Sequence, residues 1–122
     1  GDMRDVLAAR AAGAADAALG FDVYVHRLRQ GVASMAASIG GLDLIVFTGG
    51  VGEHAAPVRA AAAEGLAFLG MEVDHSTNET TSGDADISAA GAAVRTVVVT
   101  AREDLEIAQQ VRRLLGRPED RP

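Results

Sequence analysis

The sequence predicts an α/β domain with a mostly parallel sheet and flanking helices. Short continuous apolar runs alternate with amphipathic helical segments, the pattern of strand–helix units. The chain has 122 residues, 48% of them hydrophobic, which is enough to bury the core of one domain. Because only two or three strands are expected, few for a self-sufficient sheet, we expect the chain to be a piece of a larger protein.

Two helices are expected before the first strand. Residues 2–11 form the first, with Asp2 as its N-cap and Gly13 as its break. In residues 14–39, apolar side chains recur every three or four positions and so share one helical face. These residues are Phe21, Val25, Leu28, Val32, Met35 and Ile39. The pair at 40–41, both glycines, ends the second helix.

Two strands are clear and a third is short. Residues 43–48 form a continuous apolar run between glycines, which is typical of a strand buried on both faces of a parallel sheet. Residues 94–99 form a β-branched run of the same kind, and residues 71–73 are a possible short strand.

The remaining segments are helices, a loop and a tail. A helix is expected from Pro57 to Gly70, and residues 74–91 are expected to be a loop or hairpin. Residues 103–115 form an amphipathic helix, and residues 117–122 are expected to be a frayed tail after a domain of residues 1–116. The expected inner faces of the two helices are Val58, Ala62, Leu66 and Leu69, and Leu105, Ala108, Val111 and Leu115.

Composition excludes several classes of protein. The net charge is −6, which argues against a nucleic-acid-binding protein. All 11 basic residues are arginine, so the lysine of a Walker A or protein-kinase motif is missing. Cysteine is absent, and no apolar run is long enough to span a membrane. We therefore expect a soluble, cytoplasmic protein with no nucleic-acid or membrane partner.

A glycine-rich segment, residues 49–54, follows the first strand and is the strongest candidate site. Ligands of open α/β sheets bind beyond the carboxyl ends of the strands. Glycines allow backbone N–H groups to approach an anion, which favours a phosphate or nucleotide site over a simple strand-to-helix turn. We call residues 49–54 the glycine segment.

A dinucleotide-binding motif is the alternative interpretation. Residues 50–55 fit G-x-G-x-x-A, and Asp74 lies about 20 residues beyond Gly52, where such a site places an acid for the ribose. Against it, this motif normally opens its domain, whereas here two helices come first. Glu53 would also lie close to the pyrophosphate, at an electrostatic cost.

Three separated motifs resemble the acetate kinase (acetokinase) family. The first two are residues 43–53, DLIVFTGGVGE, and residues 64–70, EGLAFLG, with Val58 and Arg59 between them. The third comprises residues 86–88, 94–95 and 103–108, and the opening GDMRD adds to the match. The resemblance implies the C-terminal nucleotide-binding part of the second domain of an actin-like ATPase, or acetate-and-sugar-kinase, fold.

The resemblance also implies an activity and a site. The family transfers the γ-phosphoryl group of ATP to acetate, giving acetyl phosphate and ADP with Mg²⁺, and forms homodimers. By this likeness the metal residue is Glu103, and the family's catalytic His and Arg residues lie outside this chain. The implied nucleotide-binding residues are Asp2, Met3, Arg4, Gly50, Val51, Gly52, Glu53 and His54.

Two departures and several alternatives remain open. The family usually has Asn at His54 and at Arg102, and Arg102 could pair with Glu103 in competition with a metal ion. Propionate and butyrate kinases share this nucleotide half. We expect the chain alone to be inactive, and a non-catalytic nucleotide-binding or dimerisation module is the further alternative.

Overall fold

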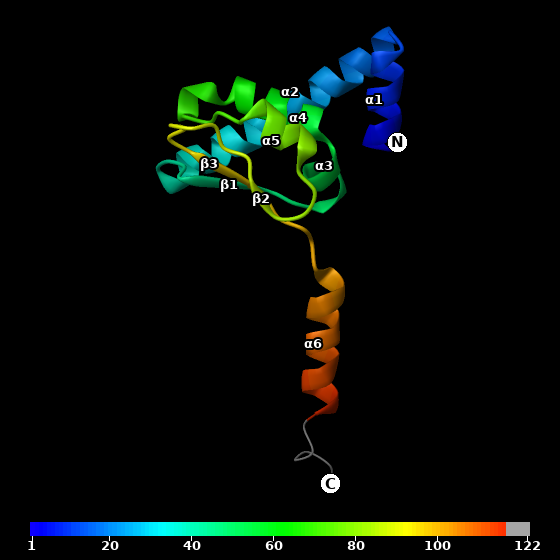
Figure 1. Ribbon diagram of the computed structural model, residues 1–122, viewed down its shortest axis with the longest axis vertical. Coiled ribbons are helices and arrows are strands. Elements are labelled where there is room, and N and C mark those ends of the chain that lie inside the picture. Colours follow the sequence, from blue (N-terminus) through cyan, green and yellow to red (C-terminus); the bar gives the residue numbers. More distant parts are fainter. Residues whose placement is uncertain (117–122) are drawn as a thin grey trace.

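A computed structural model describes residues 1–116, so the predicted frayed tail lies outside the described residues. It confirms the α/β class: helices pack on a three-stranded sheet of order β1-β3-β2 (Figure 1). Strand β1 (Leu44–Phe47) is parallel to β3 (Arg95–Val98). The two-residue strand β2 (Ala85–Asp86) is antiparallel to β3, which makes the small sheet mixed.

Helices α1 (Met3–Ala11) and α2 (Ala15–Ile39) match the predicted pair. The predicted apolar stripe of α2 is only partly correct, because Phe21 and Val25 are buried but Met35 and Ile39 are 61% and 72% exposed. A stripe spaced at 3.5 residues drifts around a straight helix by about 20° per heptad. Over 25 residues the buried face has therefore moved to Ala36.

The helix predicted from Pro57 to Gly70 is divided in two. Helix α4 (Ala56–Gly65) has Leu66 as its C-cap, and the 3₁₀ turn η1 (Ala67–Leu69) has Gly70 as its C-cap, whose φ of 95° is left-handed. The predicted loop after Val73 contains helix α5 (His75–Thr80) in addition to β2, so that prediction was wrong in part. Residues 71–73 form only isolated bridges.

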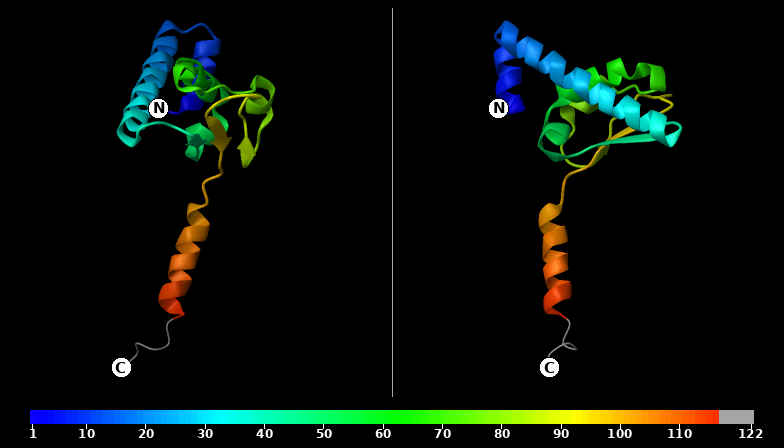
Figure 2. Two further views of the ribbon diagram at one scale, coloured as in Figure 1. Left: turned by 90° about the vertical axis from the view of Figure 1, so that its left-hand side faces the viewer. Right: turned by 180° about the vertical axis from the view of Figure 1, so that it is seen from behind.

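The main core lies on one face of the sheet. Helices α2 and α4 cover this face (Figure 2). Phe47 and Val98 of the sheet belong to the same buried cluster as Leu66. On the opposite face Leu44 and Val46 are 49% and 46% exposed. The prediction that β1 is buried on both faces was therefore wrong for residues 1–116, since no described helix covers that second face.

Helix α6 (Glu103–Leu115) has the predicted bounds but contributes nothing to the core. It extends away from the other elements, and all of its residues are exposed, including its predicted inner face (Figures 1 and 2). In the described part of the chain, no helix is both long and apolar enough to cross a membrane.

A second apolar cluster joins the N-terminal helices to the helices after β1. Its buried residues are Phe21, Val25, Ala55 and Val58, and Met3, Val6, Leu7 and Val51 pack against it. This cluster fixes α1 beside the glycine segment, although about 40 residues separate them in the sequence.

Candidate functional site

The glycine segment is a short helix, α3 (Gly49–His54), directly after β1. Gly49 has a φ of 73°, a left-handed conformation that side-chain-bearing residues seldom adopt. The chain therefore needs glycine there to turn from strand into helix. At the other end, Ala55 is buried and its N–H donates to the carbonyl of Val51.

A cavity of about 590 Å³ lies between α1 and α3. Six of the eight predicted nucleotide-binding residues line it, together with three residues that the sequence did not indicate. The lining residues are Gly1, Asp2, Met3, Arg4, Leu7, Gly50, Val51, His54 and Ala55. The structure thus brings together two segments that the sequence had linked only through a family likeness.

The polar rim of this cavity is organised by one ion pair. Asp2 is the N-cap of α1: its Oδ1 accepts from the N–H of Arg4 at 2.9 Å, and its Oδ2 accepts from the Arg4 guanidinium at 2.6 Å. These bonds lower the pKa of Asp2 and raise the pKa of Arg4. Both side chains remain accessible to a ligand, since Arg4 is 86% exposed and Asp2 42%.

Glu53 does not line the cavity, whereas His54 does. The Oε1 atom of Glu53 accepts from the backbone N–H of Gly49 at 2.9 Å and of Ala101 at 2.8 Å. Glu53 therefore connects the chain after β1 to the chain after β3, and it occupies the Gly49 amide that a phosphate could have used. The His54 side chain is 75% exposed, and its Nε2 lies 4.0 Å from the Oε2 of Glu53.

Gly52 packs closely against β1 within the domain. A Cβ atom at this position would lie 3.1 Å from the carbonyl carbon of Phe47 in β1. At Gly50, by contrast, an added Cβ would meet nothing within 4 Å. Gly50 lines the cavity and Gly52 does not. The absence of a side chain at Gly52 is explained by its close contact with β1, without a ligand.

Glu103 lies apart from the cavity, at the first residue of the exposed helix α6. Arg102 does not pair with it: the Arg102 guanidinium bonds Oδ2 of Asp84 at 2.9 Å. The Thr100 N–H and Arg102 together lower the pKa of Asp84. Among residues 1–116 no three His, Cys, Asp or Glu side chains are grouped to hold a metal ion. Glu103 could give Mg²⁺ one carboxylate, with phosphates and water completing the shell.

A buried network that the sequence did not indicate lies behind α3. Arg59 of α4 and Asn78 of α5 are each 1% exposed, and burial lowers the pKa of the Arg59 guanidinium. Arg59 donates to the carbonyls of Gly52 and Glu53 and to both oxygen atoms of Asn78. A charged residue within the alanine-rich α4 segment was the available signal.

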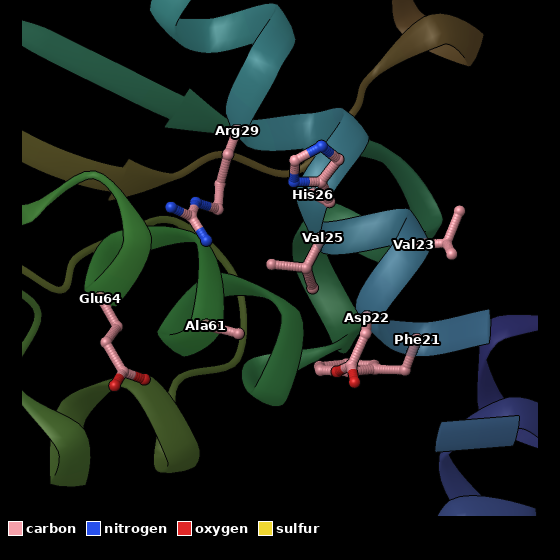
Figure 3. Close-up of a pocket in the computed structure, with 8 residues that line it drawn as sticks. All are labelled: Phe21, Asp22, Val23, Val25, His26, Arg29, Ala61 and Glu64. Carbon is pink, nitrogen blue, oxygen red and sulfur yellow. The ribbon is translucent and has the colours of Figure 1, made fainter. Parts of the chain in front are cut away.

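A second cavity of about 580 Å³ lies between α2 and α4 (Figure 3). Asp22, His26 and Arg29 come from α2, and Glu64 comes from α4. Charges of both signs line this cavity, so it favours no particular class of ligand. None of the residues predicted for nucleotide binding lies there.

Comparison with known proteins identifies the family. The acetokinase family model matches residues 1–109. Acetate kinases of Gloeobacter violaceus and Nostoc punctiforme are 50% and 47% identical over 109 and 114 residues. These alignments cover 89% and 93% of this chain but only 27% and 28% of those proteins.

Solved structures agree with the sequence comparison. Acetate kinase from Entamoeba histolytica superposes with a TM-score of 0.85 at 34% identity, covering 92% of this chain and 30% of that one. A propionate kinase from Francisella tularensis superposes with a TM-score of 0.81 at 36% identity, covering 89% and 28%. Asp74, the ribose acid of the dinucleotide alternative, instead caps α5 by accepting from Thr77. The chain belongs to the acetokinase family.

Proposed function

We propose that the cavity between α1 and α3 binds the adenosine part of ATP or ADP. The observation that carries this proposal is that Asp2, Met3 and Arg4 line the same cavity as Gly50, Val51 and His54. Family membership supports the proposal, because kinases of this family use an adenine nucleotide. The volume of about 590 Å³ lies within the usual range for small-molecule sites.

The lining side chains suit a nucleoside. Met3, Leu7 and Val51 offer an apolar surface to a purine ring, and the polarisable methionine sulfur adapts to its shape. Asp2 can accept a hydrogen bond from a ribose hydroxyl or an amino group, and Arg4 provides a cation for stacking or for phosphate charge. His54 can donate from its ring to ribose or phosphate in place of the family's usual Asn.

The whole protein is proposed to be an acetate kinase of which this chain is the C-terminal nucleotide side. It would transfer the γ-phosphoryl group of ATP to acetate, reversibly, giving acetyl phosphate and ADP. Bound Mg²⁺ would neutralise phosphate charge, with Glu103 as its protein carboxylate. We further propose a cytoplasmic homodimer, and we expect the isolated chain to bind nucleotide without catalysing transfer.

Propionate is the second candidate for the acceptor carboxylate. The specific observation is the propionate kinase structure, which is 36% identical to this chain, compared with 34% for the acetate kinase from Entamoeba histolytica. The nucleotide cavity does not distinguish the two acids, because neither would lie in it. Comparing kcat/KM for acetate and propionate in the whole enzyme decides between them.

Calorimetric titration with ADP and Mg²⁺ tests the nucleotide proposal. We expect Gly50→Val to weaken ADP binding at least tenfold, because the new side chain enters the cavity. Gly31→Val is the matched control, since it also faces open space but lies on α2 outside the cavity. Equal ADP affinity in all three proteins would contradict the proposal. Titration with NAD tests the dinucleotide alternative.

A further inference from the structure

We propose that Arg59 is a positioning residue that holds α3 in the conformation lining the nucleotide cavity; this inference rests on the nucleotide-binding function proposed above. Arg59 does not line the cavity. It binds the backbone of the glycine segment on one side, and the other side of that segment lines the cavity.

Helix α3 has little stability of its own. Three of its six residues are glycine, which has the lowest helix propensity after proline. A helix of this length does not form alone in water, because nucleation outweighs the few hydrogen bonds gained. Its conformation must therefore be imposed by surrounding groups.

Arg59 supplies the attachment at the C-terminal end of α3. Its Nη1 donates to the carbonyl oxygens of Gly52 and Glu53, each at 2.8 Å. Carbonyl groups in the last turn of a helix lack intrahelical partners, and a cation there complements the helix dipole. The attachment at the N-terminal end comes from within α3, through Glu53 and the Gly49 N–H.

The surroundings of Arg59 indicate a dedicated anchor. The residue is 1% exposed, and in the described part of the chain it forms no ion pair with a carboxylate. Its Nε and Nη2 donate to Oδ1 and O of Asn78, each at 2.7 Å. Asn78 in turn donates to the carbonyl of Ala56 at 3.0 Å. Burying a cation that is balanced only by backbone and amide dipoles has a high desolvation cost. All four hydrogen bonds are therefore needed to offset that cost, and together they hold the guanidinium and its partners in one geometry.

The two sides of α3 therefore have different roles: one lines the cavity and the other is bound to Arg59. Gly50, Val51 and His54 face the cavity, while the carbonyls of Gly52 and Glu53 are attached to Arg59. Removing the guanidinium releases the end of α3 that carries His54. The cavity should then lose its shape even though the sheet and the main core are intact.

Chemical rescue of Arg59→Ala tests this inference. We expect this variant to bind ADP at least tenfold more weakly than the unaltered chain, and 20 mM guanidinium chloride to restore part of the affinity, whereas 20 mM sodium chloride does not. Leu66→Ala, a core change away from α3, is the control for general destabilisation. It should keep ADP affinity within twofold at temperatures where circular dichroism shows it folded.

The inference is overturned if folded Arg59→Ala binds ADP normally, or if Leu66→Ala loses as much affinity. It is also overturned if guanidinium and sodium act alike. If Arg59→Ala does not fold, Arg59→Lys takes its place, because a lysine cannot make all four bonds. Amide hydrogen exchange of residues 50–55 separates the two proposals: faster exchange confined to α3 supports the role of Arg59 even if no protein binds ADP.

Discussion

The two sides of helix α3 differ in the free space beside them and in the contacts that they make. One side, Gly50, Val51 and His54, borders the cavity beside α1, and an added Cβ at Gly50 has free space. On the other side, Gly52 packs against the backbone of Phe47, and Arg59 binds two carbonyls. A glycine-rich segment can therefore combine a ligand-facing side with a side dedicated to attachment.

This difference changes how the glycines are interpreted. Gly49 is needed for its left-handed φ, Gly52 for its contact with β1, and only Gly50 for its place at the cavity. A sequence motif treats the three alike. Substitutions on the cavity side should change nucleotide affinity with little change in the free energy of unfolding. Substitutions on the attached side should lower the free energy of unfolding and, where they release α3, nucleotide affinity as well.

The largest effect is expected on the attached side, at Asn78. In Asn78→Leu the buried Arg59 guanidinium loses a hydrogen-bond partner, and we expect the free energy of unfolding to fall by about 3 kcal/mol. Urea unfolding measures this change. Glu79→Gln, an exposed substitution in the same helix, should change it by less than about 0.5 kcal/mol. If Asn78→Leu lowered the free energy of unfolding no more than Glu79→Gln does, the network would contribute little to stability.

An intermediate effect is expected from placing the same side chain on each side of α3. Gly52→Val should lower the free energy of unfolding by about 2 kcal/mol, because its Cβ is forced against Phe47. Gly50→Val should leave it unchanged or slightly higher, since valine has the better helix propensity. Thermal unfolding of the two variants gives the comparison. Equal melting temperatures would show that the sides do not differ as described.

The smallest effect concerns the N-cap Asp74 of α5, the helix that carries Asn78. Hydrogen bonds from the Thr77 side chain and backbone lower the pKa of Asp74. A folded-state pKa below the unfolded value of about 3.9 adds stability above that pH, which is lost as the pH falls through the folded value. Asp74→Asn keeps the cap, so between pH 6 and 2 its unfolding free energy should decline less steeply. Identical slopes would contradict this assignment.

Much of the fold was predictable because it depends on local patterns. The apolar runs predicted β1 and β3, and the start and end of α6 were predicted to the residue. The two-sided burial of β1 was wrong because burial depends on which elements cover a sheet. Helix α5 was missed because its only local signal is the cap at Asp74, within an otherwise polar segment.

The site was predictable in outline but not in its division of roles. Residue types at 2–4 and 50–54 carried a family likeness, and the structure brings six of those eight residues to one cavity. The long-range hydrogen bond of Glu53 and the buried network of Arg59 depend on partners at Ala101 and Asn78, far away in sequence. Spacing within a motif contains no information about such partners.

The nucleotide proposal is tested most directly by the crystal structure of this chain grown with ADP and Mg²⁺. We expect the adenine ring to lie between α1 and α3, in contact with Met3, Leu7 and Val51. ADP bound between α2 and α4 beside Arg29 and Glu64, with the first cavity free of nucleotide, would contradict it.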